Sequence, residues 1–113
     1  MHEMSLAEGV LELVEATARR EQARLVRRVV LEIGQLSAVE PEAIKFCFAA
    51  VTRGSMAQAA VLEIVELPGV GWCADCAQSV PMALRYDLCP RCGGVQVAPT
   101  AGTEMRVREI EIE

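Results

Sequence analysis

The sequence has a single histidine, His2, among its 113 residues. It also has only four aromatic residues, one lysine among eleven cations, and no apolar run near the roughly 20 residues of a membrane-spanning helix. No basic segment leads into an apolar stretch at the start, so a secretory signal is not expected. We therefore expect a cytoplasmic protein in which one imidazole serves at most one site.

Further absences exclude classes of function. The short GVG stretch at 69–71 lacks the Gly-Lys-Ser/Thr ending of a phosphate-binding loop, and no catalytic constellation accompanies the lone imidazole, so an enzyme is not expected. The net charge of −5 argues against a nucleic-acid binder, which needs a basic face. The arginine cluster over 19–28 is interpreted as a solvated helix end and strand face.

Five cysteines are present, and four of them form two Cys-x-x-Cys pairs separated by twelve residues: Cys73, Cys76, Cys89 and Cys92. In a reducing compartment such pairs favour metal over disulfides. Four thiolates can close a tetrahedron around zinc, leaving no open position, and this predicts a structural site. An iron–sulfur centre also fits soft sulfur ligands. A thiol oxidoreductase is the other alternative, although neither pair begins a helix after a strand.

The residue after each pair bears on how its turn can fold. Gly93 and Gly94 follow the second pair and allow a positive-φ turn that directs amides at the sulfur atoms. Ala77 takes the equivalent place after the first pair, so that turn is predicted to be less favourable.

Hydrophobic periodicity predicts two helices and three strands, with the cysteine module inserted before the last strand. The predicted elements are a helix over 5–21, a strand over 23–34, a helix from Pro41 to Gly54, and strands over 59–68 and 103–113. The fold class is thus α/β in the α+β sense, with two helices packed on a small three-stranded sheet and an inserted zinc ribbon. Residues 1–68 and 99–113 would form the main domain, and 69–98 the ribbon.

Four local features refine this prediction. Ser5 and Glu8 match a capping box, which would place His2 just before the first helix. That helix would bury one stripe, formed by Leu6, Val10, Leu13, Val14 and Thr17. Cys47 falls on the apolar face of the second helix and is interpreted as a small buried hydrophobe. The apolar parity of the last strand shifts between Val107 and Ile110, where a bulge is expected.

The N-terminal residues are open to two interpretations. A histidine beside the start is often chance, because chain termini tolerate most residues. Alternatively, the Met1 amine, the His2 amide nitrogen and the His2 Nδ1 can close fused five- and six-membered chelate rings. Deprotonated amide nitrogens favour a square-planar ion such as Ni(II) or Cu(II), and the Glu3 amide or carboxylate could complete the plane.

The initial Met-His-Glu, the helix after it, the CxxC-x12-CPxC spacing and the terminal REIEIE together resemble the HypA/HybF family over nearly the whole chain. The resemblance implies nickel delivery for maturation of [NiFe]-hydrogenase. It implies that Met1, His2 and Glu3 of the main domain bind Ni(II), and that Cys73, Cys76, Cys89 and Cys92 hold zinc. It further implies a maturation GTPase and the hydrogenase large-subunit precursor as partners, and leaves a homodimer open.

A zinc-ribbon module that binds a protein or nucleic acid, with no nickel role, is the alternative function. Its ribbon would offer only Arg85, Arg91, Trp72 and Tyr86 to a nucleic acid.

Overall fold

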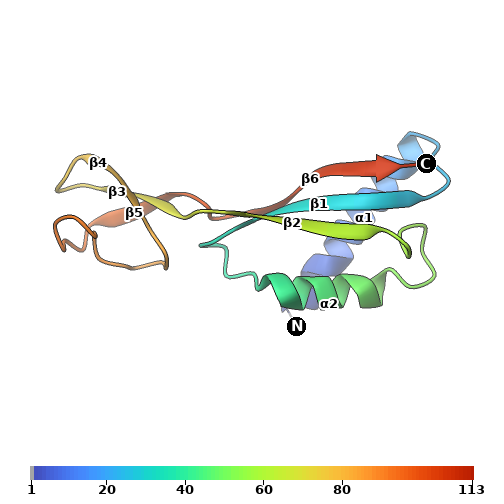
Figure 1. Ribbon diagram of the computed structural model, residues 1–113, viewed down its shortest axis with the longest axis horizontal. Coiled ribbons are helices and arrows are strands. Elements are labelled where there is room, and N and C mark those ends of the chain that lie inside the picture. Colours follow the sequence, from blue (N-terminus) through green and yellow to red (C-terminus); the bar gives the residue numbers. More distant parts are fainter. Residues whose placement is uncertain (1) are drawn as a thin grey trace. The chain divides into compact units, whose positions relative to one another are not determined.

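The computed structural model describes residues 2–113 and contains two helices and two three-stranded sheets (Figure 1). In chain order the elements are α1 (His2–Arg20), β1 (Val26–Gly34), α2 (Pro41–Val51), β2 (Val61–Leu67), β3 (Val70–Cys73), β4 (Gln78–Pro81), β5 (Val97–Ala101) and β6 (Met105–Ile112). The strand orders are β2-β1-β6 and β4-β3-β5. The predicted α+β class, with two helices, a small sheet and an inserted ribbon, is confirmed.

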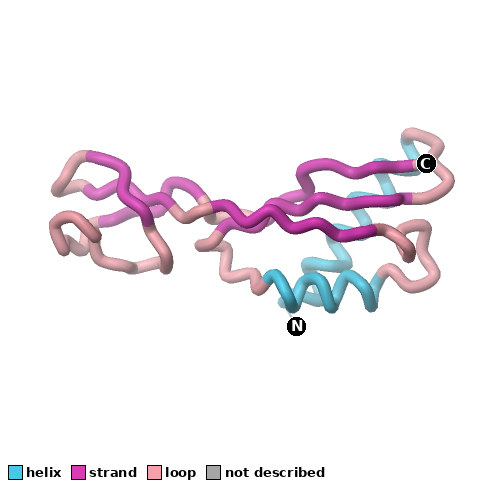
Figure 2. Tube along the Cα trace, in the orientation of Figure 1, coloured by secondary structure: helices cyan, strands magenta, loops and turns pink. Residues whose placement is uncertain are grey.

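The chain divides into two compact units. The first comprises the chain up to Leu31, Val39–Val65 and Arg106–Glu113, whereas the second comprises Glu32–Ala38 and Glu66–Met105. Both helices belong to the first unit, and the second contains only strands and loops (Figure 2). The second unit includes all of the predicted ribbon, 69–98, together with residues on either side and the short segment after residue 31.

Helix packing forms the core of the first unit. Helices α1 and α2 are in contact, and α2 contributes the buried Ile44, Cys47 and Phe48. Residues four apart lie on one helix face, so this spacing turns one stripe inward. Cys47 is 3% exposed, which confirms its interpretation as a buried hydrophobe.

Two predictions about helix α1 are wrong, its starting residue and its buried stripe. It begins at His2, so Ser5 lies within the helix and the predicted capping box and helix start are wrong. Its buried residues are Ala7, Val10, Val14 and Ala18. Leu13 is exposed instead, and Leu6 is only half-buried. Both alanines are fully buried, and their small side chains made them weak signals in the sequence.

The ends of α2 agree with the sequence. Glu40 is the N-cap residue, its carboxylate accepts a hydrogen bond from the Glu42 amide, and Pro41 begins the helix. At the other end the buried Thr52 hydroxyl donates to the carbonyl of Phe48 at 2.8 Å. This bond satisfies a buried polar group and one of the helix's last carbonyls.

Strand β1 is the central strand of the first sheet and is buried on both faces, because Val29, Val30 and Leu31 are each at most 2% exposed. In β6 half-buried and exposed residues alternate, and this alternation shifts by one residue between Val107 and Ile110, as predicted. The bulge expected there stays a prediction.

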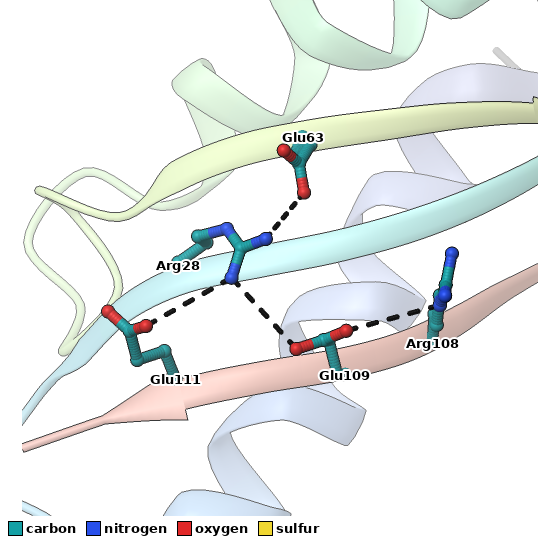
Figure 3. A network of polar contacts seen from close by, with 5 residues as sticks. All are labelled: Arg28, Glu63, Arg108, Glu109 and Glu111. Carbon is teal, nitrogen blue, oxygen red and sulfur yellow. Dashed lines mark hydrogen bonds and ion pairs between the residues drawn. The ribbon is translucent and has the colours of Figure 1, made fainter.

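Ion pairs hold the polar side chains of the first sheet in register. Arg28 of β1 donates to Glu63 of β2 at 2.6 Å and lies 3.9 Å and 4.0 Å from the carboxylates of Glu109 and Glu111 on β6 (Figure 3). The hydrogen bond that Arg28 donates to the Glu63 carboxylate raises the pKa of Arg28. Exposed pairs of this kind add little stability. Arg28 is half-buried and ion-paired, so the interpretation of the arginine cluster as a solvated face holds only for its exposed members, Arg19, Arg20, Arg24 and Arg27.

Candidate metal centre

The second unit is built around its cysteines. Strands β3 and β4 pair antiparallel, with Cys73 opposite Gln78, so the first cysteine pair forms the turn between them. The buried cluster of this unit consists of Cys73, Val80 and Cys89, with Cys76 and Val97 packed against it. Three of these five residues are cysteines, and Met82 is the other large apolar side chain buried within 69–98, so the ribbon has only a small apolar core.

The four sulfur atoms converge on one point. The Sγ atoms of Cys73 and Cys92 are 3.7 Å apart, those of Cys76 and Cys89 are 3.9 Å apart, and all four lie within 4.8 Å of one another. Zinc–sulfur bonds of about 2.3 Å in a tetrahedron place the sulfur atoms about 3.8 Å apart. The donor set and its spacing therefore fit a structural zinc ion, with no position left for a substrate.

Backbone amides of both pairs point at the sulfur atoms. The amide of Cys76 donates to the Cys73 Sγ at 3.4 Å, and that of Gly94 donates to the Cys92 Sγ at 3.3 Å. The amide of Cys92 lowers the pKa of Cys89 to about 7, whereas the hydrogen bond with the Cys92 side chain raises the pKa of Cys76 to about 12. Zinc binds thiolates, so binding of the metal would release protons from the cysteine thiols.

The second pair needs its glycines, as the sequence predicted. Gly93 has a φ of +72°. At Gly94 a Cβ atom would lie 2.7 Å from the carboxylate of Asp75 and 3.2 Å from the Cys92 Sγ. A side chain at either position would therefore disturb the turn that presents the sulfur atoms.

A segment distant in sequence completes the second unit. Leu36 is 3% exposed, its amide donates to the carbonyl of Gly102 at 2.7 Å, and its own carbonyl accepts from Arg85 Nε at 3.0 Å. The side chain of Gln35 accepts from the amide of Gly69 at 3.0 Å. Sequence reasoning missed this segment, because a turn after a strand carries no local signal of what it packs against.

The predicted nickel ligands lie at the other end of the chain. His2 is exposed and is the first residue of α1, so the prediction that it precedes the helix is wrong. Glu3 is half-buried in the first helical turn, and Met1 lies outside the described residues. The first four amides of a helix have no acceptor within it. The amides of His2 and Glu3 are therefore not engaged in helical hydrogen bonds.

Comparisons with known proteins point to one family. The family model described as HypA, hydrogenase/urease nickel incorporation, metallochaperone, matches residues 1–112. The chain is 71% identical to "Hydrogenase maturation factor HypA" of Dechloromonas aromatica (strain RCB) and 62% identical to the protein of that name in Albidiferax ferrireducens. Both alignments cover 113 residues and the whole of each chain.

Solved structures agree with these relatives. The solution structure of the Ni metallochaperone HypA from Helicobacter pylori is 32% identical, covers 97% of this chain and 96% of its own, and has a TM-score of 0.70. A second solution structure, titled HypA protein, is 33% identical, covers 100% of this chain and 97% of its own, and has a TM-score of 0.73. Within residues 2–113, neither helix is long and apolar enough to cross a membrane.

Proposed function

The chain belongs to the HypA family and is a nickel metallochaperone of hydrogenase maturation, and on this premise we propose that it carries Ni(II) on Met1, His2 and Glu3. The family assignment confirms the resemblance and the nickel function expected from the sequence, and the matches give no support to a zinc-ribbon module without a nickel role. The observation that best supports the ligand set is the exposed position of the chain's only histidine at the first residue of α1.

The proposed chelate uses backbone as well as side-chain nitrogen. The Met1 amine, the His2 amide and the His2 Nδ1 close two fused rings around the ion, and the Glu3 amide or carboxylate takes the fourth place. Amides without a helical acceptor can lose their protons to a metal without breaking the helix. Anionic amide nitrogens favour square-planar Ni(II) over Zn(II), although Cu(II) would bind the same donors more tightly.

The four cysteines have a different task. Cys73, Cys76, Cys89 and Cys92 would hold zinc in a closed site, and the metal would supply folding free energy that the small ribbon core lacks. We assign residues 1–68 and 99–113 to the nickel-binding domain and 69–98 to the zinc ribbon. This division is supported by the placement of both helices in one compact unit and all four ligating cysteines in the other.

The partners follow from the task of carrying nickel. The ion is handed on through protein contacts, with a maturation GTPase of the same pathway and the hydrogenase large-subunit precursor as partners, and with a homodimer as a further assembly. No step of this task needs catalysis, so the protein acts without being an enzyme. The thiols of a zinc site persist in a reducing compartment, which supports a cytoplasmic location.

A calorimetric Ni(II) titration of the zinc-loaded chain tests the ligand set. Any purification tag belongs at the C-terminus, because an N-terminal extension would remove the amine donor. We expect one tight site per chain, lost in His2→Ala and in a chain whose terminal amine is acetylated. Ser5→Ala, exposed on the same helix, is the matched control and should bind as the unaltered chain does. Equal binding by His2→Ala would refute the proposed chelate.

A further inference from the structure

The chain between β1 and α2 contains a strained residue. Ala38 has a φ of +64°, in the left-handed region that glycine adopts more readily than alanine. Its side chain is exposed, so burial does not offset this strain. Residues other than glycine persist in such conformations only where their surroundings hold them, and switch regions are among the places where they cluster. Residues 35–38, which we call the β1–α2 connection, must therefore be held by contacts with other segments.

The β1–α2 connection belongs to the second unit and makes backbone hydrogen bonds there. The amide of Gln35 donates to the carbonyl of Leu67 at 2.8 Å, and the amide of Leu36 donates to the carbonyl of Gly102 at 2.7 Å. Both acceptors lie outside the ribbon residues, 69–98, and the Gln35 side chain reaches only the first of these, Gly69. These bonds by themselves do not involve the part of the ribbon that contains the cysteines.

Arg85 links the β1–α2 connection to the cysteine part of the ribbon. Its Nε donates to the carbonyl of Leu36 at 3.0 Å, and a charged donor makes a stronger hydrogen bond than a neutral one. Arg85 lies in the loop over 83–88, which leads directly into the buried Cys89. A hollow of about 160 Å³ is lined by residues of both segments, Gln35, Leu36, Ala38, Leu84 and Arg85. The hydrogen bond, rather than close packing, therefore joins the two segments there.

We propose that Arg85 is a latch that holds the β1–α2 connection in its strained conformation only while zinc orders the loop before Cys89. The inference rests on the proposed zinc site. Without the metal the cysteines no longer fix the loop, Arg85 leaves the Leu36 carbonyl, and the strain at Ala38 favours opening of the connection. The next residues along the chain are Val39 and the N-cap residue of α2. The conformation of the chain that enters α2 thus depends on zinc.

Amide hydrogen exchange, followed by NMR on the full-length, zinc-loaded chain, tests the latch. The amides of Gln35, Leu36 and Ser37 are the reporters, because each donates to a backbone carbonyl. In Arg85→Ala they should exchange at least tenfold faster, while the amides paired between β3 and β4 keep their rates and the chain keeps its zinc. Arg91→Ala removes an exposed arginine of the same unit and is the matched control, which should change none of these rates.

Two further measurements test the strain and the role of zinc. Glycine adopts the positive φ without strain, so adding Ala38→Gly to Arg85→Ala should slow the exchange of the three reporter amides again. An unchanged or faster rate would overturn the strained state that the latch is proposed to hold. Removal of zinc from the unaltered chain with a chelator should release the three reporter amides, as Arg85→Ala does.

Two results would overturn the latch while the zinc site stands. One is equal exchange of the reporter amides in Arg85→Ala and the unaltered chain. The other is loss of zinc from Arg85→Ala with faster exchange in β3 and β4, because Arg85 would then only stabilise the ribbon. Failure of the zinc site itself is distinguishable. A chelator would then leave the amides paired between β3 and β4 slow in the unaltered chain, and zinc control of the latch would be refuted with it.

Discussion

Ala77 and Gly93 occupy equivalent places in the two cysteine turns. Each follows the second cysteine of its pair, and each amide donates at 2.8 Å to the carbonyl of the first cysteine, Cys73 or Cys89. Both residues have positive φ, +53° for Ala77 and +72° for Gly93. One turn is thus built with the residue that this conformation favours, and the other with a residue that it strains.

Ala77→Gly should stabilise the zinc-loaded chain. Glycine removes the strain of the left-handed conformation from the folded chain, and it also increases the conformational entropy of the unfolded chain. The first effect is the larger, so we expect the free energy of unfolding to rise by about 0.5–1 kcal/mol. Trp72, the only tryptophan, lies in β3 and reports unfolding of the ribbon by fluorescence. Ala74→Gly, at an exposed position without positive φ, is the control and should lower stability slightly. A decrease in Ala77→Gly would contradict the strain argument.

Two other glycines should respond to alanine in opposite directions. At Gly34 a Cβ atom would overlap backbone atoms of Gly102, so Gly34→Ala should cost about 2–3 kcal/mol through displaced backbone. Gly9 lies exposed within α1 with no atom within 4 Å of the added Cβ, so Gly9→Ala should gain about 1 kcal/mol from helix propensity. Thermal unfolding of both variants measures the contrast, and equal effects would refute it.

Removal of zinc should unfold the second unit and leave the helices intact. The buried cluster of that unit consists mainly of the metal ligands, whereas α1 and α2 pack in the first unit. With a chelator we expect the fluorescence of Trp72, which is 46% exposed in the folded chain, to change as the ribbon unfolds, while the helical dichroism at 222 nm is largely retained. Loss of both signals together would show that the two units do not fold separately, and loss of neither would contradict a structural zinc.

Much of this architecture is readable from the sequence, because its signals are local. The spacing of Cys73, Cys76, Cys89 and Cys92 is enough by itself to indicate a metal cluster, and Pro41 marks the start of α2. The predicted start of α1 was wrong because Ser5 and Glu8 match a cap equally well inside a helix. The packing of Leu36 into the second unit depends on residues more than 30 positions away, which no local pattern encodes.

Acid should weaken the ion pairs at the end of the first sheet. Arg27, and then Arg24, hold the pKa of Glu113 below its ordinary value of 4.5. The Glu113 carboxylate therefore binds a proton less readily in the folded chain than in the unfolded chain. The stabilisation that its ion pairs provide is complete above pH 4.5 and is lost as the pH falls below that value. The stability difference between the chain and Glu113→Gln should therefore shrink on acidification and in high salt. Glu12→Gln, exposed on α1, is the control, and a difference independent of pH would contradict the pairing.

Transfer of nickel from the loaded chain tests the delivery role most directly. The zinc-loaded protein, charged with one equivalent of radioactive Ni(II), is mixed with purified hydrogenase large-subunit precursor, and the nickel content of the separated precursor is measured. We expect the unaltered chain to transfer its nickel, and His2→Ala, incubated with the same nickel and freed of unbound ion, to transfer almost none. Equal nickel in the precursor after both incubations would contradict delivery from the N-terminal chelate.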